Sequence, residues 1–83
     1  MESAQVPSHV EMLIVRSTSV RAIGYDDSDA TLYVRFANGS VYRIRAVPPN
    51  TVDSFLAAPS KGRFYNESIR DAYADVTCIL RAR

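Results

Sequence analysis

The 83-residue chain has little of what several classes of protein require. Its single cysteine, Cys78, excludes an internal disulfide and a cysteine-based metal site. Its single histidine, His9, has no serine or cysteine nucleophile that the sequence can pair with it. No apolar run approaches the roughly 20 residues of a membrane-spanning helix, and the N-terminus lacks the basic and apolar regions of a signal peptide. We therefore expect a cytoplasmic protein that is not an enzyme, needs no cofactor or metal, and has no membrane partner.

Three acids crowd one short segment, at Asp26, Asp27 and Asp29. Such a cluster would attract a divalent cation, but the segment lacks the glycine and the distal glutamate of a calcium-binding loop. Aspartate is also an ordinary turn residue, because its side chain bonds the backbone two residues on. We therefore expect a turn here, with neither a metal ion nor a catalytic role.

The segment TLYVRFANGSVYRIRAV, residues 31–47, predicts a β-hairpin, because two alternating runs flank the turn pair Asn38-Gly39. A two-residue turn would place arginines on the apolar face. A three-residue loop over residues 37–39, with Gly39 in the left-handed conformation, shifts the register by one residue and separates the two kinds of side chain. We predict the second register. Its core face holds Leu32, Val34, Phe36, Tyr42 and Ile44, and its outer face holds Tyr33, Arg35, Val41, Arg43 and Arg45.

Residues 19–25 predict a strand before the hairpin, joined to it by a four-residue turn over residues 26–29. That turn would place Tyr25 opposite Ala30 and Ile23 opposite Leu32. Both side chains would then join the core face.

Two helices are predicted after the hairpin. Pro48-Pro49 ends the last strand and suits the start of a helix, which carries Val52, Phe55 and Leu56 at helical spacing and stops before Pro59. The second helix is predicted over residues 63–73.

The predicted fold is α+β, a three- to four-stranded antiparallel meander with two short helices packed on one face. One domain spans residues 12–80, between a flexible N-terminal tail at residues 1–11 and a C-terminal tail at residues 81–83. The apolar segments 12–15 and 76–80 leave open whether each adds a strand to the sheet.

An ordered series of motifs runs from Ile23-Gly24-Tyr25-Asp26 through Asn38-Gly39, Val41-Tyr42 and Val47-Pro48 to Ser60-Lys61-Gly62-Arg63-Phe64-Tyr65-Asn66, Ile69 and Tyr73. Over about residues 15–73 this series resembles the KTSC domain, a family named for a C-terminal segment of certain lysyl-tRNA synthetases and also found as small stand-alone bacterial proteins. The chain departs from the family pattern at Ile44, where a second tyrosine is usual, and at Pro59, where an acid is usual. In the predicted register Ile44 faces the core, so that change is a core substitution. The synthetase connection implies nucleic acid as the partner, and RNA more than DNA.

The outer face of the hairpin is the first candidate binding surface. The planar arginine fork suits phosphate, and an adjacent tyrosine can stack on a base, so this face predicts a platform for single-stranded nucleic acid. The alternative is a charged face that keeps the sheet soluble.

The turn at residues 60–63 is a second candidate, because backbone N–H groups and two cations there would hold an anion. The alternative explanation of the same residues is structural: Ser60 caps a helix, Gly62 forms the turn and Asn66 ties the turn down. The predicted nucleic-acid-binding residues are Tyr33, Arg35, Arg43, Arg45, Lys61 and Arg63.

An exposed sheet edge supports a different class of function. An edge strand can accept the strand of a partner through main-chain hydrogen bonds, and five tyrosines favour an interface mildly. The alternative prediction is therefore a protein-protein interaction module, or a homodimer that pairs edge to edge.

Overall fold

One antiparallel sheet dominates the computed structural model, which describes residues 6–82. Its five strands lie side by side in chain order, β1 (Met12–Ile14), β2 (Val20–Asp26), β3 (Thr31–Phe36), β4 (Val41–Ile44) and β5 (Val76–Leu80). The predicted α+β class is confirmed, but the count of three to four strands is too low. The short apolar segments 12–15 and 76–80 supply the two edge strands. β1 pairs with the free side of β2, and β5 pairs with the free side of β4.

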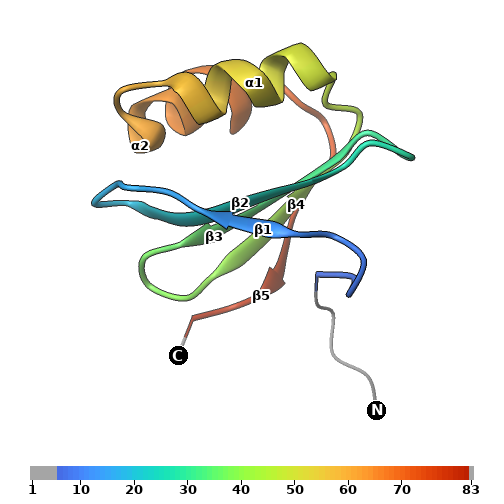
Figure 1. Cartoon of the computed structure of the whole chain (residues 1–83), viewed down its shortest axis with the longest axis horizontal. Helices are drawn as coiled ribbons and strands as arrows, with labels where there is room; N and C mark the ends of the chain where they lie inside the picture. Colours follow the sequence, from blue (N-terminus) through green and yellow to red (C-terminus); the bar gives the residue numbers. More distant parts are fainter. Residues whose placement is uncertain (1–5, 83) are drawn as a thin grey trace.

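The helices cover one face of this sheet (Figure 1). The first, α1 (Pro49–Ala57), begins as predicted, because Pro48 is extended with φ −71° and ψ 153° and Pro49 lies in the first turn. The second begins earlier than predicted, at α2 (Lys61–Phe64), because the Ser60 hydroxyl accepts the Arg63 N–H at 3.3 Å and caps it.

A wider turn follows α2 directly. The chain continues as the π-helix η1 (Tyr65–Ile69), in which the Arg70 N–H donates to the Tyr65 carbonyl at 2.8 Å. The predicted single helix over residues 63–73 is therefore wrong in its bounds and in its regularity. Apolar spacing alone does not distinguish an α-helix from one interrupted by a π turn.

The hairpin has the predicted register. Leu32 lies opposite Ile44 and Val34 lies opposite Tyr42. The loop spans residues 37–39, since the Phe36 N–H donates to the Ser40 carbonyl at 2.8 Å, and Gly39 has φ 97°. The three-residue loop and the separation of the two faces are therefore confirmed.

The preceding β2–β3 connection differs from its prediction. Tyr25 lies opposite Leu32 and Ile23 lies opposite Val34, two residues away from the predicted pairing. β2 extends one residue further than expected, to Asp26, which pairs with Thr31, so the four-residue turn occupies residues 27–30, with Ala30 at φ 55°. An offset of two residues keeps each side chain on its predicted face.

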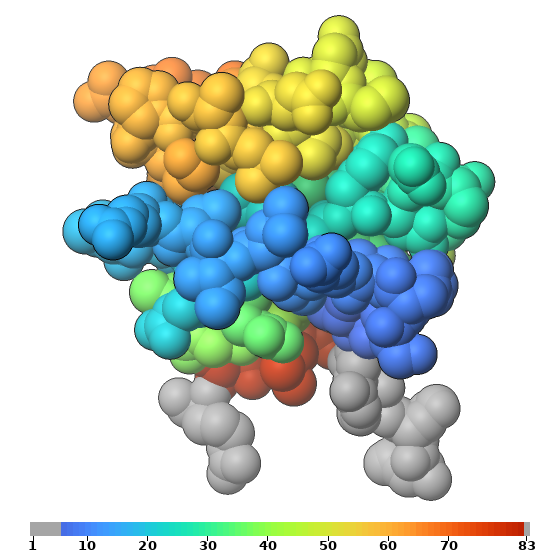
Figure 2. Space-filling model, in the orientation of Figure 1, coloured from blue at the N-terminus to red at the C-terminus, as the bar shows by residue number. Residues whose placement is uncertain are grey.

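The core lies between the sheet and the helices. In Figure 2 the helices, in yellow and orange, form one layer on top of the strands, and the N-terminal residues, in blue, run along the front of the sheet. The buried cluster comprises Val20, Ile23, Leu32, Val34, Ile44, Val47, Val52, Phe55, Tyr65 and Ile69. Within residues 6–82, no helix has the length and apolar character needed to cross a membrane.

The predicted N-terminal tail, residues 1–11, is folded in part. Residues 1–5 lie outside the described part of the chain. Val10 is buried, and its Cγ1 lies 3.0 Å from the point where a β-carbon on Gly24 would stand. At the other end, the Ala82 N–H donates to the Ser40 hydroxyl at 3.1 Å, and residue 83 again lies outside the described residues. Segments just beyond the predicted domain, 12–80, thus contact the sheet.

Candidate functional site

Three arginines lie on the outer face of the hairpin, the face opposite the helices. Arg43 pairs with Tyr33 and Arg35 with Val41, so these residues alternate with the core residues of the same strands. Arg35 and Arg43 are half-buried and Arg45 is exposed. The Nε of Arg43 is buried and has no hydrogen-bond partner in the described part of the chain. Buried donors are nearly always paired, so this nitrogen is an exception within the described residues.

Tyr33 shares this face but is buried, with 5% of its surface exposed. It lies opposite Gly24, over which Val10 and Met12 pack from the N-terminal segment. Burial raises the pKa of Tyr33, and the nearby Asp29 carboxylate raises it further. The ring is therefore not presented to solvent as a stacking surface.

Arg45 is paired with an acid from the segment before β5. Its Nε lies 3.4 Å from Oδ2 of Asp75, and both side chains are about half exposed. Exposed pairs of this kind contribute on the order of 0 to 1 kcal/mol. A phosphate could therefore compete with Asp75 for this arginine.

Lys61 and Arg63 lie on the other side of the sheet. Both belong to α2 in the helix layer, where the Lys61 ammonium donates to the Ala58 carbonyl at 2.6 Å and Arg63 is exposed. The structure thus brings the four hairpin residues together and places the two helix cations on the opposite face.

A cavity of about 470 Å³, which we call the hairpin-tip cavity, lies between the end of the hairpin and η1. Phe36 and Tyr42 line it from the sheet, and Tyr65, Asn66 and Arg70 line it from η1 and the residue after it. Phe36 meets Tyr42 and Tyr65 edge to face, with ring centroids 5.6 Å and 4.9 Å apart. The cavity therefore has an aromatic wall and a polar rim.

Two polar side chains of this cavity, Tyr65 and Asn66, are not used by the fold, whereas Asn38 and Ser40 are hydrogen-bonded within it. Burial raises the pKa of Tyr65 to about 12, with a further contribution from the neighbouring Tyr42 hydroxyl. Neither the Tyr65 hydroxyl nor the Asn66 amide has a side-chain hydrogen bond within residues 6–82. Asn66 does not tie down the turn, as the sequence suggested, and Arg70 was not singled out at all. The only sequence signal for this cavity was the motif at residues 60–66, which includes Tyr65 and Asn66.

A second cavity of about 440 Å³ adjoins the first. The two share Ser19, Phe36 and Asn66, and the second extends along α2 to Arg63 and Glu67. Arg70 therefore lines the first cavity and Arg63 the second.

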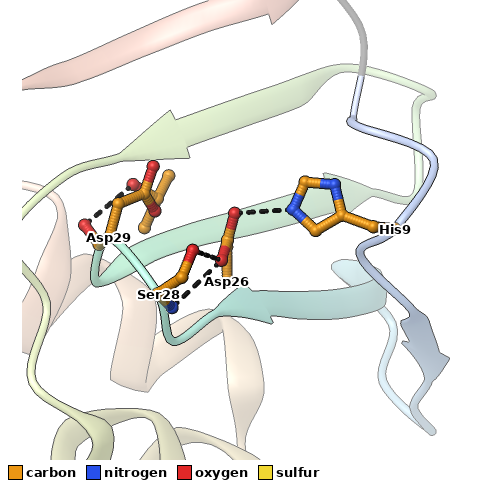
Figure 3. Close-up of polar contacts among 5 residues, drawn as sticks. His9, Asp26, Ser28 and Asp29 are labelled. Atoms are coloured by element: carbon orange, nitrogen blue, oxygen red, sulfur yellow. Dashed lines mark hydrogen bonds and ion pairs between the residues drawn. The ribbon is translucent and has the colours of Figure 1, made fainter.

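A polar cluster occupies the opposite end of β3, around the β2–β3 turn (Figure 3). His9 Nε2 lies 2.9 Å from Oδ2 of Asp26, while the Ser28 N–H and hydroxyl donate to the other oxygen of Asp26 at 3.1 and 2.6 Å. The pKa of Asp26 is lowered, first by the Ser28 hydroxyl and then by His9. Ser28 contacts the carboxylate and not the histidine, so the three residues do not form a nucleophile, base and acid in series.

The acids of this turn do not assemble a metal site in the structure. Across residues 6–82 there is no group of three or more His, Cys, Asp or Glu side chains placed to hold a metal ion. The cluster instead fixes the conformation of the turn and holds the N-terminal segment against β2.

Residues 16–73 of the chain match the KTSC domain family. An uncharacterized protein of Stutzerimonas stutzeri is 40% identical over 58 residues, which cover 70% of this chain and 82% of that protein. A lysine–tRNA ligase of Nostoc punctiforme is 33% identical over 54 residues, which cover 65% of this chain and 10% of the ligase. The crystal structure of a KTSC domain protein from Yersinia pestis is similar with a TM-score of 0.77 at 30% identity, covering 84% of this chain and 97% of that one. The chain belongs to the KTSC domain family.

Proposed function

We propose that this domain is a cytoplasmic, non-enzymatic module that binds single-stranded nucleic acid, RNA in preference to DNA, through the outer face of β3 and β4. The observation that carries the proposal is the grouping of Arg35, Arg43 and Arg45 on the outer face of the hairpin. The planar guanidinium group carries paired N–H donors, and its two terminal nitrogens can hold two oxygens of one phosphate side by side. Arg43 is thus suited to act as a phosphate clamp.

Two neighbouring arginines, Arg45 and Arg35, provide further phosphate-binding groups on the same face. Arg45 follows Arg43 by two residues, a step of about 6.6 Å on an extended chain, and Arg35 lies on the adjacent strand. A single strand that crosses the hairpin would meet three guanidinium groups. Since Tyr33 is buried, contact on this face is with the backbone of the nucleic acid, which predicts little sequence preference.

The preference for RNA rests on kinship with a ligase that is named for a tRNA. The stretch of 54 residues at 33% identity lies in a lysine–tRNA ligase of Nostoc punctiforme. Lys61 and Arg63 enter this proposal only for a longer strand that also crosses the helix side of the domain.

A fluorescence-anisotropy titration with a labelled single-stranded RNA tests the proposal at low and at physiological salt. Three phosphate contacts give a slope of log affinity against log salt of about −2, at roughly −0.7 for each contact. Replacing Arg43 and Arg45 with Ala should bring the slope to about −0.7 and leave the circular dichroism spectrum unchanged. The matched control replaces both with Lys, which keeps the charge but removes the planar fork of donors. We expect it to retain the salt dependence and to bind less tightly than the parent protein. No binding at low salt, or equal binding by the parent and the Ala variant, contradicts the proposal.

A second candidate function is favoured by the edge of β1. Ile14 and Leu13 are exposed there by 84% and 46%, and an apolar edge strand can accept a partner's strand. The Val15 N–H donates to the Arg21 carbonyl at 3.1 Å, so by alternation the Ile14 N–H points outward. Ile14→Pro would remove that donor while preserving the β1–β2 pairing. Under this alternative the variant loses self-association, or capture of a partner protein, whereas RNA binding does not change.

A further inference from the structure

We infer that the hairpin-tip cavity holds one unpaired nucleotide, with the base against the aromatic wall, its edge on Asn66 and its phosphate on Arg70. This inference rests on the proposed nucleic-acid function but concerns a different site. The outer face would hold the backbone without regard to sequence, and the cavity would hold a single base.

The size and wall of the cavity suit a planar ring. Its volume of about 470 Å³ falls within the range of roughly 300–1,000 Å³ typical of small-ligand sites. Phe36, Tyr42 and Tyr65 form its wall. Stacking of a base on an aromatic side chain contributes substantially to single-strand binding for every base, because each base has a π face.

The amide of Asn66 supplies the polar recognition. An asparagine side chain offers a donor and an acceptor together, the pattern that pairs with the edge of a base. Asn38 also lines the cavity, but its oxygen already accepts the Ser40 N–H at 2.9 Å, so its amide is held by the hairpin loop. Asn66 has both functions free within residues 6–82 and is exposed.

The charge of the cavity suits a phosphate. No acidic side chain lines it, and Arg70 is its one cation among the described residues. Arg70 has only a weak external partner, since its nitrogen lies 3.5 Å from an exposed Asp71 oxygen. In the adjoining cavity Arg63 lies near Glu67, which reduces the attraction of that part for a second phosphate.

The π turn is what brings the base wall and the phosphate donor together. In a regular α-helix, residues five apart are separated by about 140° around the axis. In a π turn the i and i+5 residues are hydrogen-bonded and lie closer to the same side. Tyr65 and Arg70 are related in this way, and both line the cavity. Such turns occur frequently at functional sites.

NMR titration of the whole protein with adenosine monophosphate and uridine monophosphate tests the site. We expect resonances of Asn66, Tyr65 and the hairpin tip to shift, and the same probes without phosphate, adenosine and uridine, to bind about tenfold more weakly. Arg70→Ala should raise the dissociation constant for the monophosphates about tenfold, and Asn66→Ala several-fold. Arg16→Ala and Asn50→Ala are the matched controls, because they make the same changes at exposed positions outside both cavities. They should leave the dissociation constant for the monophosphates unchanged.

The outcomes separate this inference from the proposed function. If single-stranded RNA binds and neither monophosphate shifts the cavity resonances, the base site is wrong and the outer-face proposal stands. If inorganic phosphate alone reproduces the shifts, the cavity is an anion site and the base assignment is wrong. If neither RNA nor monophosphate binds, both proposals fail. Binding that Arg70→Ala and Asn66→Ala do not weaken also overturns the inference.

Discussion

The two ends of β3 use their polar groups in opposite ways. At the Thr31 end, the Tyr25 hydroxyl donates to the Val47 carbonyl at 2.6 Å and the Val47 N–H donates to the Ala30 carbonyl at 2.9 Å. At the Phe36 end, the hydroxyl of Tyr65 and the amide of Asn66 surround a cavity without a side-chain hydrogen bond in the described part of the chain. Asn38 and Ser40 are also hydrogen-bonded at the Phe36 end, so the difference lies in Tyr65 and Asn66. We call the Thr31 end the closed end and the Phe36 end the open end.

This difference separates fold from function within a small domain. Polar groups that bond each other stabilise the structure and have little left to offer a ligand. Polar groups at a cavity contribute little to folding, because water satisfies them in the folded and the unfolded state alike. The open end is therefore where substitutions should alter binding with little loss of stability.

The largest contrast is expected between two glycines. A β-carbon on Gly24, beside Tyr25, would stand 2.5 Å from Met12 Sδ and 3.0 Å from the Glu11 carbonyl oxygen. Gly24→Ala should therefore lower the free energy of unfolding by about 2 kcal/mol, because the Met12 side chain must move away and the Glu11 carbonyl must shift slightly. Gly39, at the open end, has no atom within 4 Å of that position and a φ of 97°, so Gly39→Ala should cost only about 1 kcal/mol of backbone strain. Urea denaturation measures both, and equal losses would contradict the comparison.

A pair of tyrosines gives a smaller contrast with identical chemistry. Tyr25→Phe leaves the Val47 carbonyl without its donor and should lower the free energy of unfolding by about 1 to 1.5 kcal/mol. Tyr65→Phe removes a hydroxyl that has no partner within residues 6–82. It should change the free energy of unfolding by less than about 0.5 kcal/mol. A loss at Tyr65 as large as that at Tyr25 would mean that the open end also supports the fold.

Alkali adds a second measurement on the same pair. Because burial raises the pKa of Tyr65 from 10.0 to about 12, the folded state keeps a proton that the unfolded chain releases near pH 10. The resulting stabilisation is present below pH 10 and is lost as the pH rises towards 12. Tyr65→Phe should lose less stability over this window than the parent protein. Tyr25 also has a raised pKa, through burial and the nearby Asp27, so Tyr25→Phe should show a milder loss than the parent protein as well.

The sequence predicted the arrangement of this fold better than it predicted the open site. The hairpin register follows from alternation around Asn38-Gly39, because any other register mixes arginine with the core. The strands at residues 12–15 and 76–80 remained open, because runs this short have no period that distinguishes them from packed extensions. Tyr33 looked available because its strand alternates, whereas it pairs with Gly24, over which Val10 and Met12 pack from a segment far away in the sequence.

The hairpin-tip cavity could not be predicted from the sequence either, because it depends on contacts between segments that are far apart along the chain. The π turn brings Tyr65 and Arg70 to the same cavity, and no spacing rule used on the sequence distinguishes that turn from an α-helix. The motif at residues 60–66 marked the right segment. The motif did not indicate that Asn66 would line a cavity, where a bond that stabilises the turn was the alternative.

The smallest effect is expected in acid, at the closed end. Hydrogen bonds from Ser28 and then His9 hold the pKa of Asp26 below its usual range. The stabilisation is therefore present above the ordinary aspartate value, about 3.9, and is lost as the pH falls through the lower folded value. The free energy of unfolding of the parent protein should exceed that of Asp26→Asn near neutral pH, and the difference should shrink below about pH 4. Asp27→Asn is the matched control, because Asp27 is an exposed neighbour with no side-chain hydrogen bond in the described part of the chain. Denaturation at a series of pH values measures the difference, and parallel curves for the parent protein and Asp26→Asn would show that the carboxylate does not help to close this end.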